Sequence, residues 1–142
     1  MKIDHIGIAC EDATQFLELY CQMMNGEQEQ KTKYEEMGLN STFIKFKDMR
    51  IELLEPFKEN SVVSKFLGKR GNGLHHISFK VDDLEDFYEK NNKTGREFLH
   101  EIRTIQETDK VKKYTFLSLI LSCNIMIEVF EESIENEGNV YE

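Results

Sequence analysis

The 142-residue chain lacks the features that mark several large classes of protein. Its formal net charge is −9, and no basic stripe with interleaved aromatic residues occurs, so we do not expect a nucleic-acid partner. Residues 116–130 form the most apolar segment, but it is only 15 residues long and contains Asn124 and Glu128. A helix that crosses a bilayer needs about 20 mostly apolar residues, so we expect no membrane association.

Cysteine is also scarce and irregularly spaced. Cys10, Cys21 and Cys123 are an odd number and form no CxxC pair, which argues against a disulfide framework and against a structural zinc knuckle. No long apolar run follows Met1, so we expect no secretory signal. We therefore expect reduced thiols, mostly buried as small hydrophobic side chains, in a cytoplasmic protein.

Acidic residues gather at the end of the chain. Residues 131–142 hold five glutamates and no base, which is typical of a solvated tail. The rest of the chain is long enough for one compact domain with a core. We predict a single domain over residues 1–131 and an acidic tail over 132–142.

The chain contains an internal repeat. HIGIACEDATQFLELY begins at His5 and HISFKVDDLEDFYEKN begins at His76, and their matching residues are separated by a constant 71 positions (76−5, 77−6, 83−12, 87−16). RIELLEPF at 50–57 has its echo in MIEVFEES at 126–133, so Glu52 matches Glu128. The repeat predicts two modules, 1–58 and 73–131, joined by a link over 59–72.

Each module has the pattern of a strand, a helix and three further strands. Alternation of apolar residues predicts one strand that begins near residue 2 and another that begins near residue 73. Phe16 and Phe87 lie on the apolar faces of two amphipathic helices that follow these strands. The helices are expected to start at capping boxes made by Asp12 with Gln15 and by Asp82 with Glu85. The remaining strands are expected at 28–34, 39–47, 49–56, 98–106, 112–121 and 123–131. This is an α+β fold of paired βαβββ modules.

The second module is longer by five residues between its helix start and its last strand (128−83 against 52−12). We expect these extra residues in a longer loop near Gln106–Lys110. In the link, Ser61 is expected to cap a short amphipathic turn at 62–67.

Four residues at matching places of the repeat are candidates for a metal site. His5 and His76 each lie in the first strand of a module and are followed by an isoleucine and then a small residue. Glu52 and Glu128 lie within apolar strands, where a carboxylate is costly to bury unless it is paired or bound to metal. Two imidazoles and two carboxylates suit Zn, Ni, Co, Mn or Fe, and the sequence does not choose among them.

Neighbouring polar residues have simpler interpretations. His75 alternates with His76 and is expected to point to the opposite face, as a core or helix-contacting residue. Glu55 and Glu131 also repeat, but they follow the strands, so we expect them to be solvated.

The segments KIDHIGIA, RIELLEP, SVVSKFL and GLHHISFKVDDL are in the order found in the vicinal-oxygen-chelate (glyoxalase/bleomycin resistance/dioxygenase) superfamily. The resemblance covers about residues 1–131 and is greatest to the methylmalonyl-CoA epimerases. It implies that His5, Glu52, His76 and Glu128 are ligands of one divalent ion and that Glu128, or Glu52 by the pseudo-symmetry, is the catalytic base. It also implies an isomerase that moves a proton α to a carbonyl, an acyl-CoA substrate and a homodimer.

Two other functions of the same superfamily are open. The ligand set suits a glyoxalase I-like lactoylglutathione lyase, whose substrate is a thiol adduct. A non-catalytic protein that binds antibiotics or other small molecules shares the fold but commonly lacks the metal residues.

The sequence departs from the epimerases in two places. KVKKYTFLSLILSC lacks their glycine-rich segment and their His-Pro-Lys turn. Some epimerases have a second carboxylate base where this chain has Leu39-Asn40-Ser41-Thr42, and Glu35 and Glu36 are expected in the preceding turn.

Overall fold

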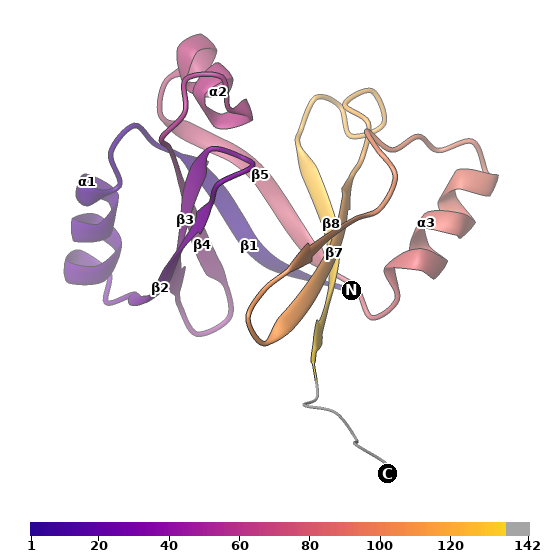
Figure 1. The fold of residues 1–142 in the computed structure, drawn as a ribbon, viewed down its shortest axis with the longest axis horizontal. Helices are drawn as coiled ribbons and strands as arrows, with labels where there is room; N and C mark the ends of the chain where they lie inside the picture. Colours follow the sequence, from indigo (N-terminus) through magenta and orange to yellow (C-terminus); the bar gives the residue numbers. More distant parts are fainter. Residues whose placement is uncertain (136–142) are drawn as a thin grey trace. The chain divides into compact units, whose positions relative to one another are not determined.

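In the computed structural model, residues 1–135 are described. They form the following elements (Figure 1): β1 (Lys2–Ala9), α1 (Thr14–Leu17) with its π-helical continuation η1 (Glu18–Met23), β2 (Glu27–Tyr34), β3 (Leu39–Lys45), β4 (Arg50–Pro56), α2 (Val62–Arg70), β5 (Gly73–Lys80), α3 (Leu84–Lys93), β6 (Arg103–Gln106), β7 (Lys110–Phe116) and β8 (Ile127–Ile134). The hydrogen-bonded strand order is β2-β3-β4-β1-β5-β8-β7-β6. The acidic tail was predicted over 132–142, but residues 132–134 continue strand β8, so the predicted boundary was wrong; the part of the predicted tail beyond residue 135 lies outside the described residues.

The chain folds into two compact units. One comprises Asp4–Ile77, and the other combines Met1–Ile3 with the described residues from Ser78 to 135. In the first unit β1 pairs in parallel with β4, and β2, β3 and β4 pair antiparallel. In the second unit β6, β7 and β8 pair antiparallel. The strand–helix–three-strand order of each module confirms the predicted α+β fold of βαβββ repeats.

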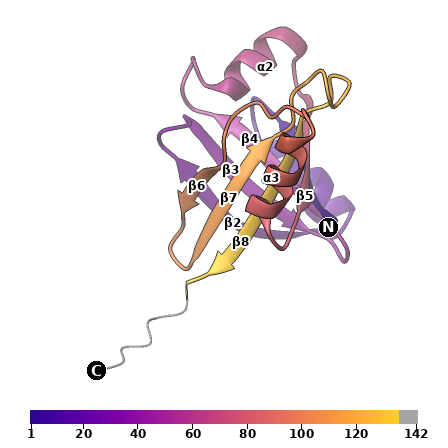
Figure 2. The same cartoon turned by 90° about the vertical axis from the view of Figure 1, so that its right-hand side faces the viewer.

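The helices cover apolar clusters on the strands. Ile8 of β1 lies on the side opposite His5 and packs with Ile44 and Leu53 against Phe16 of the first helix. A second cluster packs Leu54 under α2. In the other unit Leu84 at the start of α3 packs on Val129 of β8, and Figure 2 shows the helix beside that strand. Among the described residues, none of the helices has the length and apolar character to cross a bilayer.

The helix caps were predicted in part. Ser61 caps α2 as expected, because its Oγ accepts from the backbone N–H of Ser64 at 3.0 Å. At α3 the cap is Asp83, which accepts from the N–H of Asp86, so the predicted Asp82 was wrong by one residue. The predicted Asp12–Gln15 box was also wrong. Asp12 accepts from the N–H of Thr14, but it precedes Ala13, the residue at the N-cap of α1.

Glu55 and Glu131 are half-buried and accept hydrogen bonds from the backbone, whereas we expected them to be solvated. Glu55 accepts from the backbone N–H of Ala13 at 2.7 Å, and Glu131 accepts from that of Leu84 at 2.8 Å. Both N–H groups belong to the start of a helix, where backbone donors have no intrahelical partner and negative charge is favourable. Since Ala13 and Leu84 are also 71 residues apart, the repeat includes this link between last strand and helix.

The extra residues of the second module lie after β7, not at the predicted Gln106–Lys110. Glu107 and Lys110 close a tight turn, with the N–H of Glu107 donating to the carbonyl of Lys110 at 2.8 Å. The connection from β7 to β8 spans residues 117–126, whereas its counterpart in the first module spans only 46–49. Strands expected over 112–121 and 123–131 are therefore interrupted, and β6 is shorter than the predicted 98–106.

Cys123 lies in this long connection and is exposed, so the expectation of burial was wrong for this cysteine. Its φ is 55° and that of Asn124 is 66°, so both residues adopt a left-handed turn conformation. Cys10 is fully buried, as expected, and Cys21 is partly buried.

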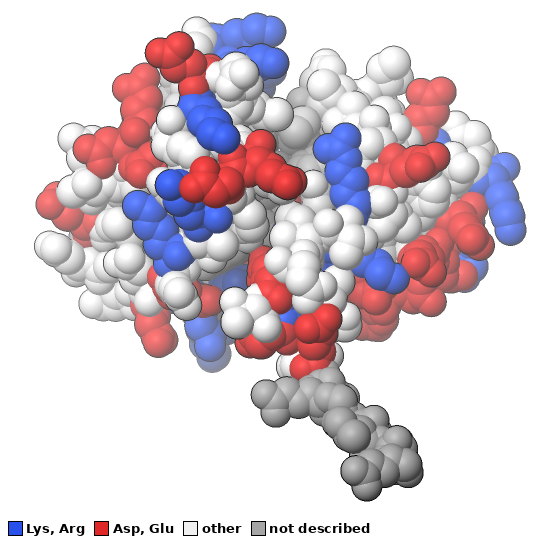
Figure 3. All heavy atoms as spheres, viewed as in Figure 1, with Lys and Arg blue, Asp and Glu red and all other residues white. Residues whose placement is uncertain are grey.

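Charged side chains of both signs are interspersed on the face shown in Figure 3.

Candidate metal centre

Three of the four predicted ligands converge within one unit. His5 lies on β1, Glu52 on β4 and His76 on β5. The parallel register of β1 and β4 places Gly7 opposite Glu52. All three ligand side chains are buried, with residue exposures of 1% for His5, 8% for Glu52 and 6% for His76.

Their donor atoms are spaced as ligands of one ion would be. The Nε2 atoms of His5 and His76 are 3.2 Å apart, and Oε1 of Glu52 lies 3.6 Å from the first and 3.4 Å from the second. Ligands about 2.1 Å from a metal, at angles between octahedral and tetrahedral, are roughly 3.0–3.5 Å from each other. The residues present therefore fit a divalent ion held by two imidazoles and a carboxylate. One possible ligand atom from each of the three residues lies within 4.8 Å of the other two.

The hydrogen bonds around His5 direct its lone pair toward the other ligands. Its Nδ1 lies 2.8 Å from Oδ2 of Asp4, and Asp4 also accepts from Nη2 of Arg50 at 2.7 Å. Burial would raise the pKa of Asp4, but the hydrogen bonds from His5 and Arg50 outweigh it and hold this pKa well below its usual range. An ionised carboxylate only accepts, so Nδ1 of His5 carries the proton, and in the neutral ring Nε2 keeps its lone pair.

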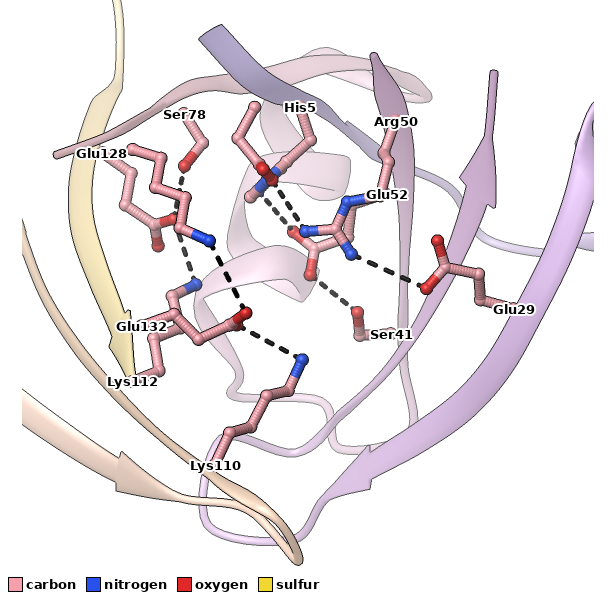
Figure 4. A network of polar contacts seen from close by, with 12 residues as sticks. His5, Glu29, Ser41, Arg50, Glu52, Ser78, Lys110, Lys112, Glu128 and Glu132 are labelled. Carbon is pink, nitrogen blue, oxygen red and sulfur yellow. Dashed lines mark hydrogen bonds and ion pairs between the residues drawn. The ribbon is translucent and has the colours of Figure 1, made fainter. Parts of the chain in front are cut away.

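Glu52 is also oriented by a neighbour. Ser41 Oγ donates to its Oε2 at 2.6 Å, which leaves Oε1 as the oxygen nearest to the two imidazoles (Figure 4). Burial would raise the pKa of Glu52, but when the imidazoles of His5 and His76 are protonated, their hydrogen bonds and charge hold this pKa well below the usual range. Glu52 is therefore a carboxylate, the form that binds a metal.

The imidazole of His76 occupies space that a side chain at residue 7 would fill. A Cβ built on Gly7 would lie 2.2 Å from Cε1 and 2.4 Å from Nδ1 of His76. In the first module, the small residue that follows the predicted histidine ligand is therefore needed to leave room for the ring of His76.

Glu128 lies on β8 in the other unit. It is buried, and its Oε1 accepts from Ser78 Oγ at 2.7 Å and from Lys112 Nζ at 3.1 Å (Figure 4). Lys112 also lies over the ring of Phe130, 4.7 Å from its centroid. Ser78 is the counterpart of Gly7 in the repeat (78−7 = 71), and its contact with Glu128 resembles that of Ser41 with Glu52 in the other unit.

Several of these neighbours were missed in the sequence. Asp4, Arg50 and Lys112 gave no signal of their own, since charged residues on strands are commonly solvated. Ser41 stands where a second carboxylate base was sought, and here it supplies a hydroxyl. His75 contacts the helix residue Phe66, as expected, with ring centroids 5.1 Å apart, but its Nδ1 also lies 3.0 Å from Nδ1 of His76.

Comparison with known proteins identifies the fold and this strand arrangement. The sequence model described as the Glyoxalase/Bleomycin resistance protein/Dioxygenase superfamily matches residues 4–116. Among solved structures, a hypothetical protein from Bacillus halodurans has a TM-score of 0.86 and 27% identity, over 96% of this chain and 98% of that one.

Other matches are to epimerases. The S115T variant of Streptomyces coelicolor methylmalonyl-CoA epimerase, in complex with 2-nitronate-propionyl-CoA, has a TM-score of 0.82 and 30% identity, over 92% of this chain and 94% of that one. Mitochondrial methylmalonyl-CoA epimerase of Dictyostelium discoideum is 31% identical over 84 residues, which are 58% of this chain and 51% of that protein. The chain thus spans about half the length of such curated relatives.

Proposed function

Because the chain belongs to the Glyoxalase/Bleomycin resistance protein/Dioxygenase superfamily, we propose that it is a metal-dependent epimerase acting on an acyl-CoA of the methylmalonyl type. One observation carries the proposal: Nε2 of His5, Nε2 of His76 and Oε1 of Glu52 converge at 3.2–3.6 Å in a buried setting. The similarity to epimerases, including one solved with an acyl-CoA analogue, supports the choice of substrate class.

His5, Glu52 and His76 would hold the divalent ion. The repeat adds Glu128 as the proposed fourth ligand, because it matches Glu52 in the second module. When bound, such an ion supplies Lewis-acid stabilisation of the negative charge that forms on a carbonyl oxygen after loss of the α-proton. Zn, Co, Ni and Mn all accept this donor set.

Epimerisation requires that a proton leaves C2 on one face and that another is delivered to the opposite face. We assign removal of the proton to a carboxylate, with Glu128 as the first candidate and Glu52 as the second. Ser78 and Lys112 both contact Oε1 of Glu128, which orients this carboxylate. Ser41 does the same for Glu52 through Oε2. In both units a serine hydroxyl thus orients the candidate base.

The test is solvent exchange. Protein loaded with Co²⁺ or Zn²⁺ is incubated in D2O with (S)- or (R)-methylmalonyl-CoA, and the incorporation of deuterium at C2 is followed by mass spectrometry. We expect incorporation that requires metal and is lost in His76→Ala. Absence of exchange in protein that contains about one metal per chain would contradict the epimerase assignment.

The same preparation distinguishes the two rival functions. Turnover of a methylglyoxal–thiol adduct, without exchange on acyl-CoA, would identify a glyoxalase I-like lyase. A protein that does not bind Zn, Co, Ni or Mn but does bind a small molecule would be a non-catalytic binding protein of this fold.

A further inference from the structure

We propose that Asp4 and His75 are positioning residues that hold the imidazoles of His5 and His76 in the tautomer that a metal requires. The inference rests on the proposed metal-dependent function. It concerns residues that would not touch metal or substrate and would act through the two histidines.

The case for Asp4 is made by its hydrogen bonds. Its Oδ2 lies 2.8 Å from Nδ1 of His5 and 2.7 Å from Nη2 of Arg50, so a single oxygen accepts from both. The side chain of Asp4 is 13% exposed and that of His5 is 1% exposed, so little water competes for the contact. A carboxylate bound to the far nitrogen of a metal-binding histidine fixes the tautomer and raises its basicity as a ligand.

Asp4 is itself held in place. Arg50 lies over the ring of Phe43, 4.1 Å from the centroid, and that ring contacts the edge of His5 with centroids 5.1 Å apart. Nη1 of Arg50 is also 3.7 Å from Oε2 of Glu29 on β2. The guanidinium, the carboxylate and the imidazole therefore form one packed group in which Asp4 has little freedom to turn away.

His75 has the corresponding contact to the second imidazole. Its Nδ1 lies 3.0 Å from Nδ1 of His76, and its ring packs against Phe66 of α2. When Nδ1 of His76 donates to Nδ1 of His75, the Nε2 lone pair of His76 points toward His5 and Glu52. His75 would then be a neutral acceptor in the role that the Asp4 carboxylate has for His5.

The repeat relates the two contacts. Asp4 and His75 are 71 residues apart, as are His5 and His76, so each candidate ligand is oriented by the residue that precedes it. The orienting groups differ in charge, because one is an ionised carboxylate and the other an imidazole. We infer that His5 is the stronger ligand of the pair and that loss of Asp4 costs more metal affinity than loss of His75.

Variants separate geometry from charge. Asp4→Ala removes the acceptor and is expected to weaken Co²⁺ or Zn²⁺ binding by roughly 10- to 100-fold. Asp4→Asn can place its carbonyl oxygen at the position of Oδ2 and should retain more affinity. His75→Ala should weaken binding less than Asp4→Ala, and His75→Asn, whose amide oxygen can replace Nδ1, should restore it. Asp82→Ala, which removes an exposed carboxylate, is the control.

A second readout does not depend on metal. In metal-free protein with ¹⁵N-labelled histidine, long-range ¹H–¹⁵N correlations show which ring nitrogen of His5 carries the proton at a pH where the ring is neutral. We expect Nδ1–H in the parent and in Asp4→Asn, and a mixture of tautomers in Asp4→Ala. This measurement on the parent remains decisive even if Asp4→Ala does not fold.

The outcomes distinguish this inference from the proposed function. A parent in which His5 is protonated at Nε2, or an Asp4→Ala variant that binds metal as tightly as Asp82→Ala, would overturn the role of Asp4. An unchanged affinity in His75→Ala would overturn that of His75. The expected tautomer in a protein that binds no metal would leave the positioning of His5 intact and reject the metal-dependent function.

Discussion

Gly7 shows how a single atom controls the candidate site. The ring of His76 lies where a Cβ of residue 7 would be, at 2.2 Å from Cε1, and real side chains do not approach so closely. The absence of a side chain at this position thus permits His76 to reach the other two ligands. In the second module the same place holds Ser78, whose hydroxyl contacts Glu128.

Gly7→Ala is expected to displace His76 and to lower both stability and metal affinity. Overpacking of a buried site typically costs about 1–3 kcal/mol, and we expect metal affinity to fall at least about 10-fold because one ligand moves. Denaturant unfolding and metal titration measure the two effects. Gly68→Ala is the matched control: no atom lies within 4 Å of the added Cβ, and alanine favours the helix. Equal behaviour of the two variants would contradict the steric argument.

Glu128→Gln tests the proposed base. Glutamine keeps the size and one oxygen donor but cannot accept the proton as a carboxylate does. We expect the variant to retain most of its metal and to lose turnover by roughly 10²-fold or more, as for removal of a general base. Glu132→Gln, on the same strand and paired with Lys110 at 3.2 Å, is the control. Near-normal turnover with metal bound would move the base to Glu52, and after it to Glu35 or Glu36.

At the scale of elements, each module links its last strand to the start of its own helix. Glu55 of β4 accepts from the N–H of Ala13 before α1, and Glu131 of β8 accepts from the N–H of Leu84 in α3. These carboxylates satisfy donors that the helix leaves free. They lie three residues after Glu52 and Glu128, so the strands that carry the candidate ligands are joined to the helices by their next polar residues.

The start of α3 offers a test of a single cap. Asp83→Ala removes the acceptor for the N–H of Asp86 and is expected to lower the free energy of unfolding by about 1 kcal/mol. Asp82→Ala removes the same charge one residue earlier and should change it by less than about 0.5 kcal/mol. Urea unfolding of the two variants measures the difference. A larger loss in Asp82→Ala would mean that the cap is assigned to the wrong residue.

At the scale of the whole molecule, the proposed metal site draws on β1, β4 and β5, which are distant in the sequence. An ion that binds these residues together in the folded chain, and not in the unfolded one, stabilises the fold by mass action. Metal binding is therefore expected to be visible as global stability as well as in catalysis.

We expect thermal unfolding to shift upward on addition of Co²⁺ or Mn²⁺. At a free concentration about 1,000 times the Kd, the stabilisation is roughly 4 kcal/mol. Differential scanning calorimetry of chelator-treated and metal-loaded protein measures it, and His76→Ala should show little change. An equal shift in the parent and in His76→Ala would place the metal elsewhere.

The internal repeat made the fold predictable. The constant spacing of 71, with apolar alternation and helical stripes, identified two βαβββ modules, and the structure confirms them. It also pointed to His5, Glu52 and His76, which the structure brings together. Local periodicity was enough here because each module repeats the same strand and helix pattern.

Other features were decided only by tertiary structure. The sequence placed the extra residues of the second module near Gln106–Lys110, but that turn is tight and the connection after β7 is long. The spacing of the repeat gives the number of extra residues. Their position depends on which of the connections between paired strands is the longer one, and the spacing does not show this. The cap at Asp83 and the contacts of Glu55 and Glu131 were missed for a related reason, since each depends on a backbone donor whose position follows from packing.

The candidate centre divides in the same way. By itself, the sequence determined the types of candidate ligand and their matching places, because a repeated histidine or glutamate is visible without coordinates. Only the tertiary structure decided what surrounds them: Asp4 on His5, Ser41 on Glu52, His75 on His76 and the space left by Gly7. These contacts join residues through side-chain rotamers and strand register, and no spacing along the chain encodes such geometry.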